Sequence, residues 1–286
     1  MRLLELIERC SARLQEAGVS FGHGTTNAFD EAVWLALWRL KLPLDDLDGV
    51  ADLALTPAQQ AAVEALVERR IRTRRPAAYL TGEAWLQGLP FHVDERVIVP
   101  RSLIAEVLAE GLIDTWLGAS PRRVLDLCTG NASLAVLAAL AWPDAVVDAT
   151  ELSADALVVA RQNVERHGLA QRIQLRQGDG LAAAQGRYEL ILCNPPYVND
   201  AAMQCLPPEY RAEPGLALAG GADGLDFIRP LLAHAGRHLQ RDGALVLEIG
   251  HERDHFEAAF PALQPLWLST SAGDDQVLLL SAGQLA

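Results

Sequence analysis

From Arg101 onward the chain alternates short apolar runs with longer stretches of helical spacing, and this alternation limits its fold more than any other feature. Strands that alternate with helices are typical of βαβ units, which build a parallel sheet with helices on both faces. The sequence therefore predicts a doubly wound α/β fold, whose ligands bind at the carboxyl ends of the strands. The expected strands are residues 124–127, 145–150, 173–175, 189–193 and 244–249, followed by a hairpin of 266–270 and 276–280 around Gly273-Asp274-Asp275.

The first hundred residues have a different pattern. Apolar residues recur at helical spacing in three stretches of the first 75 residues, and Thr56-Pro57 is a typical helix start. Trp34 lies in the second stretch and is expected to be a core residue. Residues 79–99 mix glycines with aromatic and β-branched residues, which favours a hairpin. We expect a helical domain over 1–78, a hairpin linker over 79–100 and an α/β domain over 101–286.

Charge and composition exclude several classes of function. The chain has 37 acidic and 24 basic residues, a formal net charge of −13. Affinity for phosphate backbones comes mostly from Lys and Arg, so we expect no direct nucleic-acid substrate and favour a basic macromolecular partner. The chain shows no secretory leader and no apolar run that suits a membrane span. Its four cysteines form no CxxC pair, so we expect a reduced, cytoplasmic protein without membrane contact.

The turn after the first predicted strand has the features of a ligand site. Asp126 opens the turn, and the small residues Cys128, Thr129 and Gly130 allow the backbone to approach a ligand. The turn lacks the GxGxxG pattern of dinucleotide-binding proteins. A carboxylate at this point suits the ammonium group of S-adenosyl-L-methionine, whereas it would repel a pyrophosphate.

Two further carboxylates follow the next two strands. Glu151 ends the second strand, where it can accept hydrogen bonds from two ribose hydroxyls. Asp179 follows the third strand, where it can accept one from the exocyclic amine of adenine. An acidic residue after each of three consecutive strands is unusual enough to favour S-adenosyl-L-methionine as the cofactor.

Asn194-Pro195-Pro196-Tyr197 follows the fourth strand and is the most specific motif of the chain. Two consecutive prolines cannot continue the hydrogen-bond ladder of a strand, so they indicate a rigid loop. The Asn194 side chain and the Pro195 carbonyl offer two acceptor oxygens, which together can hold both hydrogens of a planar NH₂ group. Tyr197 is expected to wall the pocket and stack on that group.

These motifs carry a family resemblance. Residues 194–197, the turn of residues 126–130 and the segment of residues 97–102 together resemble the HemK-like glutamine methyltransferases, and the similarity extends to residues 75–82 and 210–214. The resemblance implies a class I S-adenosylmethionine-dependent methyltransferase with a Rossmann-like, seven-stranded sheet. Within the family, Cys128 and Ser102 resemble the branch that methylates a glutamine of large-subunit ribosomal protein L-three. The branch that methylates the GGQ glutamine of peptide chain release factors is the alternative.

The resemblance also implies roles for the domains and residues. Residues 1–78 would recognise the protein substrate, and residues 101–286 would be the catalytic domain of a protein-(glutamine-N5) methyltransferase. The catalytic residues would be Asn194, Pro195 and Tyr197, and the cofactor-binding residues Asp126, Cys128, Thr129, Gly130, Glu151, Asp179 and Asn194.

Two alternatives stay open at this point. The Asn-Pro-Pro-Tyr loop also occurs in methylases of exocyclic amines of nucleic-acid bases, because adenine presents the same planar NH₂ group. Ala132 stands where the family usually has glycine, and its methyl group could crowd the cofactor. Loss of cofactor binding would leave a chain that serves only as an assembly partner.

Two other motifs require interpretation. His251 to His255 matches the HExxH pattern of zinc proteases, but its inner residues are charged and no third ligand follows, so we expect a polar helix start and no metal. The segment from Arg69 to Arg75 holds five arginines. These arginines are expected either to contact RNA or a protein partner or to form a solvated helix face.

Overall fold

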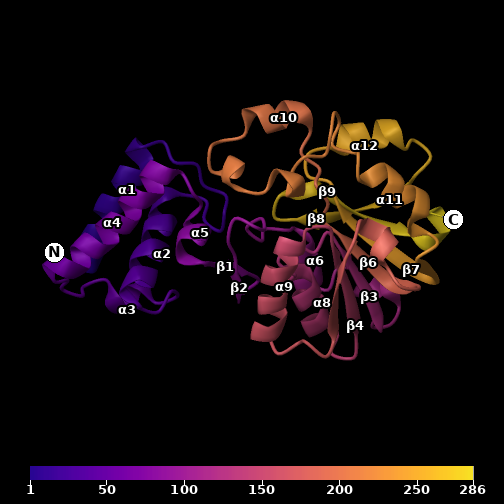
Figure 1. Ribbon diagram of the computed structural model, residues 1–286, viewed down its shortest axis with the longest axis horizontal. Helices are drawn as coiled ribbons and strands as arrows, with labels where there is room; N and C mark the ends of the chain where they lie inside the picture. Colours follow the sequence, from indigo (N-terminus) through magenta and orange to yellow (C-terminus); the bar gives the residue numbers. More distant parts are fainter. Residues whose placement is uncertain (286) are drawn as a thin grey trace.

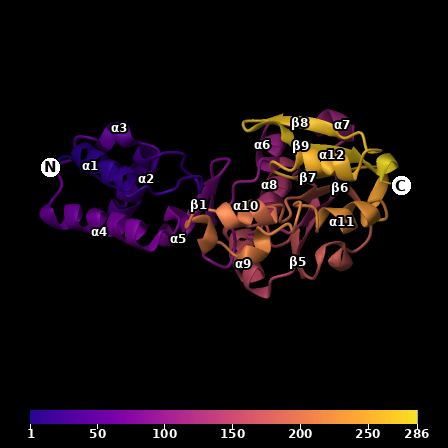
Figure 2. The same cartoon turned by 90° about the horizontal axis from the view of Figure 1, so that it is seen from above.

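The computed structural model describes residues 1–285 and places a group of N-terminal helices beside a larger α/β unit (Figures 1 and 2). The helix predicted at Thr56-Pro57 begins there: Thr56 and Gln59 cap each other reciprocally, with Pro57 in the first turn. Apolar sides of the helices pack into one cluster. No helix within residues 1–285 has the length and apolar character to cross a bilayer. The N-terminal helices are α1 (Leu3–Glu16), α2 (Ala28–Leu40), α3 (Leu47–Val50), α4 (Pro57–Thr73) and α5 (Ala77–Thr81).

A short hairpin joins the helices to the α/β unit. It consists of β1 (Glu83–Leu86) and β2 (Leu89–His92), which pair in antiparallel register. The prediction of a hairpin over 79–99 was too long, because Tyr79 lies in α5 and the pairing ends at His92. The hairpin is fixed to helix α9 (Ala154–Arg166) by Asn163, whose side chain accepts a hydrogen bond from His92 N at 2.6 Å and donates one to His92 O at 3.0 Å.

A seven-stranded sheet of order β5-β4-β3-β6-β7-β9-β8 forms the α/β unit, which confirms the predicted fold class. Strands β3 to β7 pair in parallel, and β9 runs antiparallel to both of its neighbours. The strands are β3 (Arg123–Leu127), β4 (Val146–Glu151), β5 (Ile173–Gln177), β6 (Tyr188–Cys193), β7 (Leu239–Glu248), β8 (Leu266–Thr270) and β9 (Gly273–Ser281).

Two strands begin three or more residues earlier than the sequence predicted. Strand β7 begins at Leu239 rather than at Ala244, because Leu239 already pairs with Tyr188. Strand β9 begins at Gly273, which pairs with Thr270, so the final hairpin turns at residues 271–272 and not at Gly273-Asp274-Asp275.

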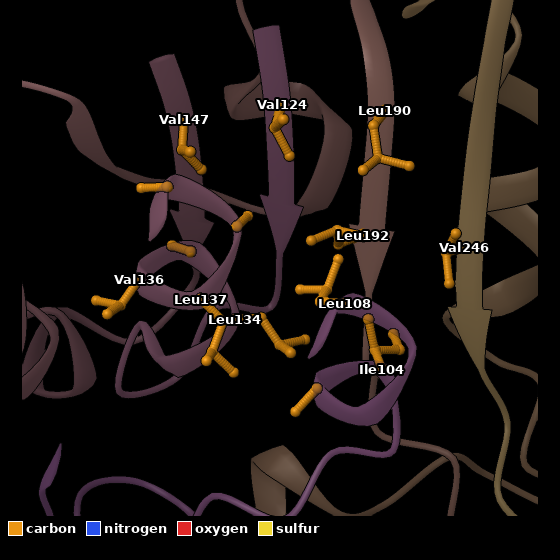
Figure 3. Packing of buried hydrophobic residues seen from close by; sticks show 14 of the residues in the cluster. Ile104, Leu108, Val124, Leu134, Val136, Leu137, Val147, Leu190, Leu192 and Val246 are labelled. Carbon is orange, nitrogen blue, oxygen red and sulfur yellow. The ribbon is translucent and has the colours of Figure 1, made fainter. Parts of the chain in front are cut away.

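Side chains alternate between two hydrophobic cores, one on each face of the sheet. On the first face Val124, Leu190 and Val246 meet helices α6 and α8 (Figure 3). On the second face Leu125 and Ile191 meet helices α11 and α12. The helices of this unit are α6 (Ile104–Ala109), α7 (Asp114–Leu117), α8 (Ser133–Ala141), α9 (Ala154–Arg166), α10 (Asp200–Cys205), α11 (Ile228–Ala235) and α12 (Arg253–Ala259), with short 3₁₀ helices at Gly180–Ala183, Tyr210–Ala212, Gly215–Ala217 and Ala282–Gln284.

The strand order creates a topological switch point. The chain runs outward from β3 to β4 and β5 and then returns to β6 on the other side of β3. The loops that follow β3 and β6 therefore diverge, which opens a crevice at the carboxyl ends of these strands.

Candidate active site

A cavity lies at this edge of the sheet, beyond the carboxyl ends of β3, β4, β5 and β6. Of the predicted site residues, the cavity is lined by Asp126, Cys128, Thr129, Gly130, Glu151, Asp179 and Asn194. Pro195 and Tyr197 are not among the lining residues. Sequence reasoning missed the apolar and cationic parts of the wall, because these residues come from segments far apart in the chain: Arg101, Leu152, Leu216 and Phe227.

Asp126 is a fully buried carboxylate at the end of β3. Its Oδ2 accepts hydrogen bonds from the Thr129 hydroxyl and from Ala135 N, whereas Oδ1 is buried without a partner in the described residues. Burial raises the pKa of Asp126 to about 7, although the hydrogen bonds from Thr129 and Ala135 oppose the shift. A buried acceptor that lacks a partner is rare in folded proteins, and here it offers a place for a cationic or hydrogen-bonding ligand group.

The turn after β3 is held by Glu151. Glu151 Oε2 accepts a hydrogen bond from Gly130 N at 3.0 Å, and Oε1 accepts one from Ser153 N at 2.9 Å. Cys128 and Ala132 have φ angles of 58° and 65°, a left-handed conformation in which a side chain is strained. The turn beside the cavity therefore contains residues with side chains in the left-handed region of backbone conformation.

Ala132 does not narrow the cavity. Its side chain is fully buried within the core on the α8 side of the sheet, and it is absent from the lining residues. The methyl group that distinguishes Ala132 from glycine therefore packs in the core.

The loop after β6 presents two free acceptors. Asn194 lines the cavity, and its side-chain amide has no hydrogen-bond partner within residues 1–285. The Pro195 carbonyl likewise accepts no hydrogen bond from the part of the chain that the structure describes. Both oxygens are available to a ligand that brings its own donors.

Tyr197 is held in place by contacts with the end of β7 and the residues that follow it. Its hydroxyl donates to Glu248 Oε1 at 3.0 Å, and Glu248 Oε2 accepts from the Ser102 hydroxyl at 2.6 Å and from Leu103 N at 2.9 Å. The ring lies so close to Gly250 that a Cβ there would be 2.5 Å from Tyr197 Cε2. Burial raises the pKa of Glu248. The sequence contained a signal for Glu248, which is the one carboxylate within the otherwise apolar run of residues 244–249.

Residues 207–217 form part of the connection between β6 and β7. A buried ionic network ties this segment to residues 99–101 and to His23. Glu213 accepts two hydrogen bonds from Arg101, each at 2.7 Å, and one from Val99 N at 2.8 Å. His23 Nε2 lies 3.4 Å from Glu213 Oε2. Burial opposes ionisation of Glu213, but hydrogen bonds from His23 and Arg101 lower its pKa to about 2. Pro214, which follows directly, lines the cavity, so the network fixes part of the cavity wall.

The arginine-rich segment forms a second ionic network, which reaches the same segment of residues 207–217 through Glu209. Arg70 is fully buried and lies 2.8 Å from Glu31 and 3.2 Å from Glu209. Arg74 lies 2.8 Å from Glu209, and Arg75 pairs with Glu95. The alternatives of a solvated helix face and of a contact with RNA are both wrong for Arg70, because the protein itself surrounds its guanidinium group.

The HExxH-like segment also supports the loop after β6. Glu252 Oε1 accepts a hydrogen bond from Asn199 Nδ2 at 2.7 Å, and His255 Nδ1 lies 2.6 Å from Glu252 Oε2. Within residues 1–285, no group of three or more His, Cys, Asp or Glu side chains is arranged to hold a metal ion.

A cavity at the switch point of this sheet, with carboxylates at the ends of β3 and β4 and after β5 and with a free amide after β6, defines a class I methyltransferase. Comparisons with known proteins agree. The family described as "Methyltransferase small domain" matches residues 105–206, and "PrmC N-terminal domain" matches residues 5–82.

Curated relatives narrow the class to one family. The chain is 57% identical to the ribosomal protein uL3 glutamine methyltransferase of Bordetella pertussis, over 99% of this chain and 96% of the relative. It is 52% identical to the protein of the same name in Burkholderia pseudomallei, over 98% and 94% of the two chains. The chain belongs to the family of ribosomal protein uL3 glutamine methyltransferases.

Solved structures resemble this one in fold. A methyltransferase from Pyrococcus furiosus has a TM-score of 0.50 and 20% identity, over 69% of this chain and 90% of that chain. The catalytic domain of hMettl16 in complex with the MAT2A 3'UTR hairpin 6 has a TM-score of 0.51 and 13% identity, over 79% and 81%.

Proposed function

We propose that this chain transfers the methyl group of S-adenosylmethionine to the side-chain amide nitrogen of a glutamine in ribosomal protein uL3. One observation carries the proposal: Asn194, whose side-chain amide has no partner within residues 1–285, lines a cavity whose other strand ends are acidic. The carbonyl of the next residue, Pro195, also accepts no hydrogen bond from the described residues. The names of the relatives, which span nearly the whole chain, supply the substrate.

The residues of the cavity fit the cofactor. S-adenosylmethionine supplies an electrophilic methyl group on a sulfonium. The unpartnered Oδ1 of Asp126 would hold its ammonium group, Glu151 its ribose hydroxyls and Asp179 its adenine amine. Cys128, Thr129 and Gly130 provide the close backbone approach beside the ligand, and Leu152 and Phe227 provide apolar walls.

The chain's task toward the substrate is to orient a weak nucleophile. An amide nitrogen reacts poorly because its lone pair is delocalised into the carbonyl group. If Asn194 Oδ1 and the Pro195 carbonyl accept both amide hydrogens, the lone pair is directed at the methyl group, and orientation contributes several kcal/mol to the rate. The same two oxygens stabilise positive charge as it develops on nitrogen, so no strong base is needed before transfer. As the N–C bond forms, the C–S bond of the sulfonium would break to leave a neutral thioether, and the methylated nitrogen, now acidic, would release one proton to water.

Tyr197 supports this arrangement by fixing the loop through Glu248. Its stacking on the substrate amide stays a prediction. We assign substrate recognition to residues 1–78, the connection to the hairpin segment 79–100, and catalysis to residues 101–286.

The proposal is tested by incubating the protein with S-adenosylmethionine that carries a labelled methyl group, and with purified uL3, release factor or duplex DNA in parallel. We expect label on uL3, at a glutamine located by peptide mass spectrometry. Label on the release factor alone would mean that the release factor, and not uL3, is the substrate. Label on DNA alone would refute protein methylation. If calorimetry detects no binding of S-adenosylmethionine, the chain is an assembly partner and not an enzyme.

A further inference from the structure

A second cavity, of about 560 Å³, lies where the N-terminal helices meet the hairpin. Its size is within the range of ligand-binding pockets. In both views β1 lies between the N-terminal helices and the α/β unit (Figures 1 and 2). The wall of the cavity includes two tryptophans, Trp34 on α2 and Trp85 on β1. It also includes two carboxylates, Asp30 on α2 and Asp45 in the segment that follows α2. We call this site the tryptophan–aspartate cavity.

The two indoles form apolar walls. Trp34, expected to be a core residue, does pack against the core, and it also borders this cavity. Trp85 is 44% exposed, an unusual position for so large an apolar side chain. Its Nε1 donates to Glu83 at 3.2 Å, and Glu83 in turn pairs with Arg166 at 2.6 Å. The Trp85 ring is thus anchored at its polar edge, which leaves its face free for contact.

The charge of the cavity is negative and uncompensated. Within the described residues, neither Asp30 nor Asp45 pairs with a cation, whereas Asp52 pairs with Arg2 at 2.8 Å. The chain holds no lysine or arginine between residues 42 and 68, and this stretch includes Asp46 and Asp48 beside Asp45. A concave surface with charge of one sign attracts counter-charged partners and repels nucleic-acid phosphates.

We propose that the tryptophan–aspartate cavity docks a lysine- or arginine-bearing segment of the protein substrate. The proposal rests on the proposed function, because a protein that binds ribosomal RNA must carry such basic residues to neutralise phosphates. Indole faces are the strongest cation–π partners among side chains, and the two carboxylates add charge complementarity. The cavity therefore recognises a basic segment away from the glutamine that is methylated.

One hydrophobic cluster connects this cavity to the catalytic one. Trp34 packs against the cluster that contains Val97 and Ala156, and these two residues also line the catalytic cavity. A substrate that occupies both cavities is held on two sides of one packed unit. Docking would then raise the local concentration of the glutamine at Asn194.

The test compares two double variants that change the net charge equally. Asp30→Asn with Asp45→Asn removes both carboxylates of the cavity. Asp144→Asn with Asp242→Asn is the control, because these exposed residues lie before β4 and near the start of β7, away from both cavities. Trp85→Leu removes the indole face, and Trp85→Phe restores an aromatic face. All four are measured for KM and kcat with purified uL3, and for Kd of S-adenosylmethionine by calorimetry.

For the Asp30 and Asp45 double variant we expect KM for uL3 to rise roughly three- to tenfold, with kcat and the cofactor Kd unchanged. Trp85→Leu should raise KM more than Trp85→Phe, and the control should match the wild type. Equal KM values in the two double variants would overturn the docking proposal.

A second readout does not depend on methylation. Fluorescence anisotropy measures binding of a labelled hexa-arginine peptide to each variant. The peptide should bind the wild type and the control more tightly than the Asp30 and Asp45 double variant, and equal affinity for all three would exclude the cavity as its site. If the wild type methylates no uL3, the proposed function fails, and the peptide measurement still decides whether the cavity binds basic segments.

Discussion

The hydroxyl of Tyr197 donates a hydrogen bond to Glu248, and this bond ties the loop after β6 to the end of β7. Ser102 donates to the other oxygen of the same carboxylate. Three segments that are distant in sequence therefore converge on one buried carboxylate behind the catalytic loop.

Tyr197→Phe should lower kcat severalfold without changing the cofactor Kd. The change leaves Glu248 Oε1 buried without this donor and should lower the free energy of unfolding by about 1–3 kcal/mol. Tyr188→Phe is a matched control, because it removes a buried bond to Asp148, 2.7 Å long, remote from the catalytic loop. The control should lose stability but keep its kcat, as measured by urea unfolding and single-turnover methyl transfer. Equal kcat losses in both variants would contradict a positioning role for Tyr197.

Asn194→Ala should abolish methyl transfer and leave cofactor binding nearly intact. The variant removes one of the two acceptors that orient the amide and keeps the carboxylates that hold the cofactor. Calorimetry with S-adenosylmethionine and a labelled-methyl assay separate these effects. Full turnover by the variant would remove Asn194 from the mechanism.

Cofactor binding should strengthen as pH rises from 6 to 7.5. Because the pKa of Asp126 is raised to about 7, the free protein carries this carboxyl partly protonated at neutral pH. The cofactor's ammonium favours the ionised form, so Kd should fall by up to about tenfold per pH unit below 7. Binding should weaken again near pH 8, roughly where an α-amino group loses its proton.

Asp126→Asn is the control for this pH dependence. The variant should bind the cofactor weakly and show no strengthening between pH 6 and 7.5. A raised native pKa also means that the cofactor-free protein loses stability as pH rises from about 4 to 7, with a limiting slope of about 1.4 kcal/mol per unit. Urea unfolding of the wild type and the variant should therefore diverge across this range.

Glu213→Gln should lower the free energy of unfolding by about 2–4 kcal/mol at pH 7, because it leaves Arg101 without its buried carboxylate partner. The native pKa of Glu213 is lowered to about 2, so its ionised form stabilises the fold above its ordinary value of 4.5. The difference from the wild type should shrink as pH falls from 4.5 toward 2. Asp223→Asn breaks a more exposed pair with Arg229 and should lower stability by less than about 1 kcal/mol.

Ala132→Gly should change the cofactor Kd by less than twofold, because the Ala132 methyl group packs in the core. Gly130→Ala adds a methyl group at a residue that lines the cavity and has a φ of 56°, so it should weaken binding. Calorimetry on both variants checks this contrast. Tighter binding by Ala132→Gly would show that the methyl group crowds the cofactor after all.

The sequence predicted those parts of the site that depend on local pattern. Asp126, Glu151 and Asp179 could be found because each lies at or shortly after the end of a recognisable strand. The bond between Arg101 and Glu213 joins residues 112 positions apart, and no local periodicity indicates such a contact. The turn at residues 271–272 was also missed because it depends on pairing between strands. Glycine is typical of turns, but Gly273 pairs with Thr270 of β8 and is therefore part of strand β9.

The buried bond between Arg70 and Glu209 makes the N-terminal helices and the connection between β6 and β7 a single unit for protein engineering. Moving the N-terminal helices into a relative that lacks a carboxylate at the position of Glu209 would leave the buried charge of Arg70 uncompensated. A chimaera designed to change substrate preference should therefore exchange residues 207–214 together with the N-terminal helices, although more than a hundred residues of chain separate the two segments.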